Sequence, residues 1–203
     1  PEFNNSGLIL LATLLVRTIA EDSSSNQNGL TISDIIQTST AINPGNSGGP
    51  LLTYSGEVVG ITTAGISNSQ SLGFAIPSDT VRRELSSLVI SGSYKLHPSI
   101  NSVGTDMNYQ IAQAVGTSVT YGWLVESVSA QNGLNGGSTH AQILGSDVTL
   151  GGDIIIAINN TRISNTDDLL SYLEQHTMPG QIVDFTAVRK GQTLTVPVTI
   201  GTA

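Results

Sequence analysis

The fold of this chain is decided by one stretch of ten residues, Asn43-Pro44-Gly45-Asn46-Ser47-Gly48-Gly49-Pro50-Leu51-Leu52. An oxyanion hole needs two backbone N–H groups that point at one position, and a side chain at Gly45 would crowd an incoming carbonyl. The pattern therefore predicts Ser47 as a nucleophile and the N–H groups of Gly45 and Ser47 as oxyanion donors. Because Gly, Ser and Asn also dominate ordinary turns, a plain turn between two strands is the alternative.

The ten residues resemble the nucleophile loop of trypsin-type serine proteases. The lead-in is Ile35-Ile36-Gln37-Thr38, and the segments that follow are Gly56-Glu57-Val58-Val59-Gly60-Ile61-Thr62-Thr63-Ala64 and Leu72-Gly73-Phe74-Ala75-Ile76-Pro77-Ser78. This order is similar to the second β-barrel of the HtrA/Deg proteases, a family of ATP-independent endopeptidases of protein quality control. From His97 onward the chain resembles the PDZ domain of that family, with the signature strand Leu150-Gly151-Gly152-Asp153-Ile154-Ile155-Ile156-Ala157-Ile158-Asn159.

The resemblance implies a mainly β fold in two domains. Residues 1–92 would form the second half of a trypsin-like double β-barrel, without the first barrel, and residues 93–203 an α+β PDZ domain. Short apolar stretches between Gly and Asn clusters favour a small antiparallel barrel in the first domain. After Pro77 the period becomes helical, with Ser78 as a cap and Gly92 as a stop. One face of this helix would carry Val81, Leu85, Leu88 and Val89.

Two segments need an interpretation of their own. The apolar run at residues 8–16 is too short to span a bilayer, which takes about 20 apolar residues. It lacks the basic residues that precede the core of a secretory signal, so we expect a strand buried on both faces, with a signal peptide as the alternative. Residues 133–149 look longer than a typical PDZ loop and predict an insertion or extra hairpin. Asn165 or Thr166 is expected to cap a helix.

The composition excludes several classes of function. The net charge is −8, from 15 acidic and 7 basic residues, so the chain cannot assemble the basic patch that nucleic acids require. No cysteine is present, which excludes disulfides and thiolate metal sites. The aspartates are too scattered to suggest a metal site. We expect no metal and no cofactor.

The resemblance places a primary specificity pocket beside the loop. Its residues would be Ala41 and Ile42, before the nucleophile, and Thr62, Thr63 and Ala64, on the strand after the next turn. None is charged, which predicts a preference for small or medium aliphatic side chains over Lys or Arg. The alternative is that Ile42 and Ala64 fill the barrel core.

A second candidate site lies in the PDZ-like half. A PDZ groove binds a peptide C-terminus as an added strand, while backbone N–H groups hold its carboxylate. Gap-free matching puts Ile100-Asn101-Ser102 at the carboxylate loop, where asparagine replaces the usual glycine and serine replaces an apolar residue. Asparagine tolerates positive φ, so the loop conformation can survive, although carboxylate binding is in doubt. The far wall would be Leu169, Leu170 and Leu173, or these would be ordinary core.

The triad histidine and aspartate of such proteases lie on the first barrel, upstream of the nucleophile. His97, His140 and His176 all follow Ser47 and lie in the PDZ-like half. The chain therefore resembles the C-terminal part of a protease, and alone it should be inactive. The resemblance implies unfolded proteins or peptide C-termini as partners. Further partners would be the missing first barrel of the same gene, on the same chain or on a nicked one, and other copies of the chain, since the family is often trimeric. The family also favours the cell envelope or an extracellular location.

Three functions remain open at this point. The chain can belong to a serine endopeptidase, to an inactive pseudo-protease that works as a peptide-binding adaptor, or to a purely structural domain. The intact Gly45-Asn46-Ser47-Gly48-Gly49 favours the endopeptidase, because a lineage without catalysis has no physical need for an exposed serine on that loop.

Overall fold

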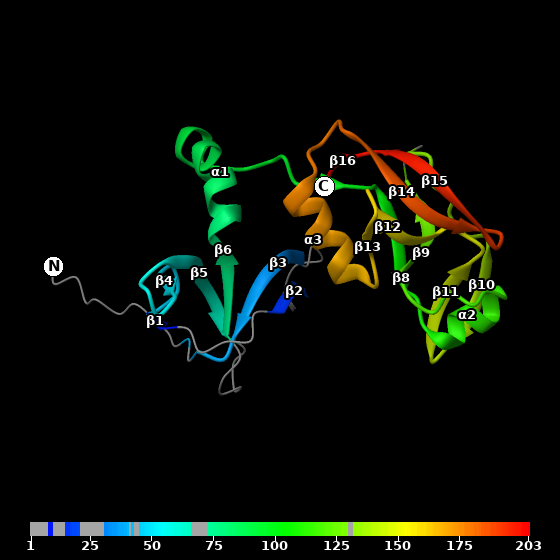
Figure 1. Ribbon diagram of the computed structural model, residues 1–203, viewed down its shortest axis with the longest axis horizontal. Coiled ribbons are helices and arrows are strands. Elements are labelled where there is room, and N and C mark those ends of the chain that lie inside the picture. Colours follow the sequence, from blue (N-terminus) through cyan, green and yellow to red (C-terminus); the bar gives the residue numbers. More distant parts are fainter. Residues whose placement is uncertain are drawn as a thin grey trace, which may run out of the picture. The chain divides into compact units, whose positions relative to one another are not determined.

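The chain divides into two compact units, Pro1–Tyr94 and Lys95–Ala203 (Figure 1), close to the boundary expected after residue 92. The computed structural model describes residues 8–9, 15–20, 31–40, 42, 45–65, 73–129 and 132–203. Strands outnumber helices throughout this part of the chain, so the mainly β fold class is confirmed. No helix in it is both long enough and apolar enough to cross a membrane.

Unit 1 is built around one six-stranded sheet. Its elements are β1 (Leu8–Ile9), β2 (Leu15–Ala20), β3 (Thr31–Thr38), β4 (Pro50–Leu52), β5 (Val58–Gly65), β6 (Gly73–Pro77) and α1 (Ser78–Ser91). The strand order is β1-β4-β5-β6-β3-β2, and only the pair of β1 with β4 is parallel. The prediction of one strand over residues 8–16 is wrong, because β1 and β2 lie at opposite ends of this order.

Helix α1 follows β6 directly and stops where the sequence predicts. Gly92 has φ 72°, and its N–H donates to the carbonyl of Leu88 at 3.0 Å. The prediction of Ser78 as the cap is wrong: Pro77 occupies the cap position without a side-chain hydrogen bond, and Ser78 is the first helical residue. No residue of α1 is buried, and Val89, on the predicted apolar face, is 76% exposed.

Unit 2 combines a six-stranded sheet with two helices and a separate hairpin. Its elements are β7 (Pro98–Ser99), β8 (Ser102–Asp106), α2 (Tyr109–Val115), β9 (Trp123–Val128), β10 (Thr139–Ile143), β11 (Ser146–Leu150), β12 (Ile154–Ile158), β13 (Thr161–Arg162), α3 (Thr166–His176), β14 (Ile182–Arg189), β15 (Gln192–Thr199) and β16 (Gly201–Thr202). The sheet order is β15-β14-β12-β9-β8, with β13 beside β12, while β7 pairs with β16. The extra hairpin expected within residues 133–149 is confirmed by β10 and β11. Asn165 caps α3 as predicted, because its Oδ1 accepts a hydrogen bond from the N–H of Asp168 at 2.9 Å.

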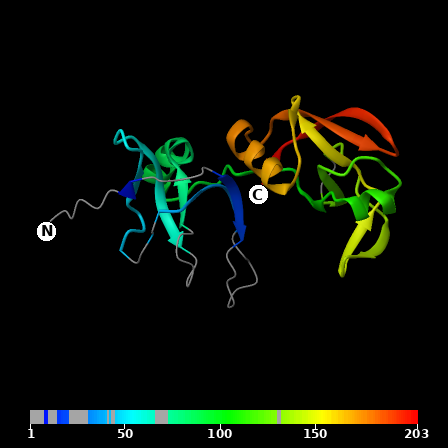
Figure 2. The same ribbon diagram turned by 60° about the horizontal axis from the view of Figure 1, so that its bottom comes forward.

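The central strand β12 is covered on both faces. Ile155 and Ile158 belong to a core cluster that includes side chains of α3. Ile154 belongs to a second cluster, which α2 and the β10–β11 hairpin complete. The hairpin lies beside α2 in both views (Figures 1 and 2). A strand covered on both sides has an unbroken apolar sequence, which explains the run from Ile154 to Ile158.

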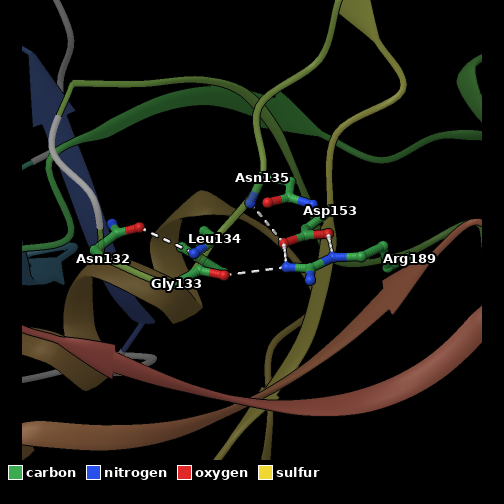
Figure 3. A network of polar contacts seen from close by, with 6 residues as sticks. All are labelled: Asn132, Gly133, Leu134, Asn135, Asp153 and Arg189. Atoms are coloured by element: carbon green, nitrogen blue, oxygen red, sulfur yellow. Dashed lines mark hydrogen bonds and ion pairs between the residues drawn. The ribbon is translucent and has the colours of Figure 1, made fainter.

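An ion pair with a buried carboxylate fixes the loop that precedes β10 (Figure 3). The Asp153 carboxylate is fully buried, and it accepts hydrogen bonds from Nε and Nη2 of Arg189, both at 2.7 Å. It also accepts the N–H of Asn135 at 2.8 Å, and Arg189 donates to the carbonyl of Gly133 at 3.1 Å. These hydrogen bonds with Asp153 raise the pKa of Arg189 above its ordinary value, so the guanidinium keeps its charge. One pair thereby joins β14, the start of β12 and the loop.

Candidate active site

The glycine-rich loop presents Ser47 to solvent between β3 and β4. Ser47 and Gly45 are both exposed. Gly45 has φ 101°, a conformation that only glycine adopts easily, and among the described residues no atom lies within 4 Å of the position that a Cβ would occupy. The glycine therefore sets the backbone direction at this position and adds no side chain there; the oxyanion hole stays a prediction.

The loop is anchored to strand β5 by backbone hydrogen bonds. The N–H of Gly48 donates to the carbonyl of Thr62 at 2.7 Å, and the N–H of Thr62 donates to the carbonyl of Gly49 at 2.9 Å. The loop also closes on itself through the N–H of Gly49, which donates to the carbonyl of Asn46 at 2.9 Å. A Cβ on Gly49 would lie 2.9 Å from that same carbonyl oxygen, so the tight turn requires glycine there.

The predicted pocket residues lie in different environments. Ile42 is half-buried and packs against Gly73, where a Cβ would lie 2.6 Å from its Cδ1. Thr62 is 2% exposed, so it lies beneath the loop rather than on an open surface. Thr63 is half-buried.

The backbone of Ala64 pairs with Phe74, beside the Gly73 that Ile42 covers. The structure thus brings Ile42 and the end of β5 to the same end of β6. Ala41 and the side chain of Ala64 lie outside the described residues.

The predicted carboxylate loop lies at the start of the edge strand β8. Asn101 has φ 48°, the conformation that the usual glycine would favour. Ile100 is 5% exposed and shares one core cluster with Leu169 and Leu173, each 1% exposed. Leu170 is half-buried and is the residue of this leucine set with surface left to contact a ligand.

Two residues that the sequence interpretation missed hold this loop. The side-chain amide of Asn132 donates to the carbonyl of Ile100. The N–H and Oγ of Ser129 both donate to the carbonyl of Asn101, at 2.9 and 2.7 Å. Neither partner is near the loop in the sequence, so no spacing rule could have identified them.

Each histidine of the chain has a partner within unit 2. Nδ1 of His97 lies 3.1 Å from Oε1 of Glu174. Nδ1 of His140 lies 3.3 Å from the hydroxyl of Thr149. The ring of His176 stacks at a tilt on Tyr172, with 4.8 Å between centroids. All three contacts lie within unit 2.

Comparison with known proteins assigns the chain to a protein family. The model of the trypsin family matches residues 9–84. The periplasmic pH-dependent serine endoprotease DegQ of Escherichia coli is 34% identical over 98% of this chain and 42% of its own length. Protease Do-like 1, chloroplastic, of Arabidopsis thaliana is 38% identical over 81% of this chain and 37% of its own length. The chain belongs to the HtrA/Deg protease family.

Solved structures give the same HtrA/Deg assignment. The HtrA-type protease AlgW with a decapeptide is 30% identical, with a TM-score of 0.59, over 92% of this chain and 55% of that one. The same protease with a tripeptide is 29% identical, also with a TM-score of 0.59, over 93% of this chain and 60% of that one. The chain thus spans about two fifths of the length of its curated HtrA/Deg relatives, by the 42% and 37% given above.

Proposed function

We propose that this chain is part of a serine endopeptidase in which Ser47 is the nucleophile. The N–H groups of Gly45 and Ser47 would stabilise the oxyanion of the tetrahedral intermediate. The observation that carries the proposal is an exposed serine on a glycine loop hydrogen-bonded to β5, in a chain of the HtrA/Deg family. The substrates would be unfolded proteins in protein quality control.

The residues beside the loop support cleavage after small or medium aliphatic residues. Ile42 presents an apolar side chain near the end of β5, and none of the other residues predicted beside it (Ala41, Thr63 and Ala64) is charged. One methylene in such a pocket changes binding by only about 1–3 kcal/mol, so the selectivity should be loose.

The proton acceptor for Ser47 would come from outside these 203 residues. All three histidines belong to unit 2 and have partners there. A serine hydroxyl without a base is a weak nucleophile at neutral pH. The chain alone should therefore be a very poor protease. Its partner would be a first barrel that carries a histidine and an aspartate, on the same chain or on a nicked one, within a homo-oligomer of the cell envelope.

Unit 2 supports a second function, peptide binding by a PDZ domain over residues 93–203. Strand β8 lies at the edge of its sheet, where an extended peptide can be added as a further strand. The positive φ of Asn101 supports a carboxylate-binding turn at Ile100-Asn101-Ser102. Without catalysis, this site alone would make the protein a pseudo-protease adaptor.

The endopeptidase is tested with the whole gene product and an unfolded protein substrate. Replacing Ser47 by alanine should lower the rate by several orders of magnitude, while Ser55→Ala, in the exposed turn after β4, should leave it unchanged. Mass spectrometry of the products should place the cuts after small aliphatic residues. An S47A protein that cleaves at the wild-type rate would refute the assignment.

The peptide site is tested by titrating the chain with the same peptide as a free acid and as an amide. Tighter binding of the acid is expected if backbone N–H groups hold the carboxylate. Equal affinities would show that residues 100–102 do not hold it.

A further inference from the structure

The hydroxyl of Thr62 is directed at the nucleophile loop. Its Oγ1 donates to the carbonyl of Asn46 at 2.5 Å and lies 3.1 Å from the carbonyl of Gly49. Thr62 is 2% exposed, so its side chain is closed off from solvent beneath the loop. A substrate could reach Thr62 only if the loop moved away.

The Thr62 hydroxyl links β5 to the part of the loop before Ser47, which the described backbone hydrogen bonds do not reach. The two backbone hydrogen bonds between β5 and the loop involve Gly48 and Gly49, which follow Ser47. In the described part of the chain, the Thr62 hydroxyl is the link from β5 to Asn46, which precedes Ser47. It therefore fixes the peptide group that joins Asn46 to Ser47.

The orientation of that peptide group decides where one oxyanion donor points. The peptide bond is planar and trans, so the carbonyl of Asn46 and the N–H of Ser47 point in opposite directions. The hydrogen bond from Thr62 holds this carbonyl oxygen toward β5, and the N–H of Gly49, within the loop, donates to the same oxygen. The N–H of Ser47 is thereby directed away from β5.

We propose that Thr62 is a positioning residue that orients the N–H of Ser47 as an oxyanion-hole donor. The inference rests on the proposed role of Ser47. Thr62 does not touch the substrate and does not line the specificity pocket in this account; it acts through the Asn46–Ser47 peptide. Preorganised donors stabilise the transition state more than the ground state, so removing the Thr62 hydroxyl should lower kcat and leave KM nearly unchanged.

The test uses the whole gene product with Thr62→Val, Thr62→Ser and a matched control, Thr53→Val. Valine keeps the shape of threonine without the hydroxyl, and serine keeps the hydroxyl. Thr53 also uses its hydroxyl to bind backbone, the N–H of Glu57 at 3.1 Å, but in the turn after β4. We expect T62V to lose about 10- to 100-fold in kcat with KM nearly unchanged, and T62S and T53V to stay close to wild type.

A second readout separates positioning from a general structural effect. A peptide boronate or aldehyde, which mimics the tetrahedral state, should bind T62V more weakly by the same factor as kcat/KM falls. Wild-type kcat in T62V would overturn the proposal, as would equal losses in T62V and T62S. A changed KM or cleavage-site preference with intact kcat would instead make Thr62 a pocket residue.

A substitute variant and a parallel measurement of S47A complete the test. If T62V does not fold, Thr62→Cys replaces it; a thiol is a weaker donor, so its kcat should lie below that of T62S, and an equal kcat would overturn the proposal. S47A is measured in parallel. Activity retained in S47A would refute the proposed function itself, whereas loss in S47A with wild-type T62V refutes only the role of Thr62.

Discussion

Replacing Arg189 by methionine should destabilise unit 2 strongly, because the buried carboxylate of Asp153 then lacks a positively charged partner. Asp153 is fully buried, whereas the side chain of Arg189 is 29% exposed. The substitution removes both 2.7 Å hydrogen bonds to the carboxylate and leaves it the N–H of Asn135 at 2.8 Å. Methionine retains most of the apolar stem, so lost packing contributes little.

The expected loss in the free energy of unfolding follows from the buried, charged carboxylate that the substitution leaves without a positively charged partner. Removing one partner of a buried ion pair typically costs about 3–5 kcal/mol, most of it the penalty for the uncompensated charge. We expect the lower end, about 3 kcal/mol, since the mutated partner is the one near solvent and one N–H still stabilises the carboxylate. With a urea slope of about 1–3 kcal/mol per M, the midpoint should fall by about 1–3 M.

Urea unfolding of the whole chain, followed by tryptophan fluorescence, measures this change. The chain has one tryptophan, Trp123, which lies in unit 2 and is 6% exposed, so its emission reports the unfolding of that unit. Lys190→Met is the matched control, because Lys190 is the next residue and is exposed; it should cost less than about 0.5 kcal/mol. If the midpoints of R189M and K190M coincide, the ion pair does not stabilise unit 2 and the reasoning fails.

Two further substitutions test unit 2 by the same unfolding curves. Gly104→Ala should lower the free energy of unfolding by at least about 1–3 kcal/mol and alter the tryptophan emission. The reason is that the new Cβ would lie 2.1 Å from the carbonyl oxygen of Leu124 and 2.7 Å from Cζ2 of Trp123. An unfolding curve like that of wild type would contradict this packing. Asn101→Gly should keep the stability of wild type, whereas Asn101→Val should lose about 1–2 kcal/mol at φ 48°, and equal stability of the two variants would show that the residue does not hold a left-handed conformation.

The sequence could predict features that depend on neighbouring residues. The Gly-rich loop, the extra hairpin, the cap at Asn165 and the stop at Gly92 each follow from local turn, cap or period rules. The run over residues 8–16 was misjudged because an apolar pattern does not reveal that strand pairing divides it between two edges of a sheet.

Features that depend on long-range contacts were out of reach. Two such contacts are the ion pair of Asp153 with Arg189 and the hydrogen bond from the Asn132 side chain to the carbonyl of Ile100; each joins residues far apart in the sequence. Thr62 shows the same limit at the candidate site. Its position in β5 was predicted, but only the folded loop reveals that its hydroxyl is directed at Asn46 rather than toward a substrate.

The central claim, that Ser47 is the nucleophile, is tested most directly by covalent labelling. The whole gene product is treated with a serine-directed phosphonylating reagent, digested and analysed by mass spectrometry. The account predicts one adduct, on Ser47, formed in step with the loss of proteolysis and absent from S47A and from the isolated 203-residue chain. An enzyme that loses its activity with the adduct on another residue would contradict it.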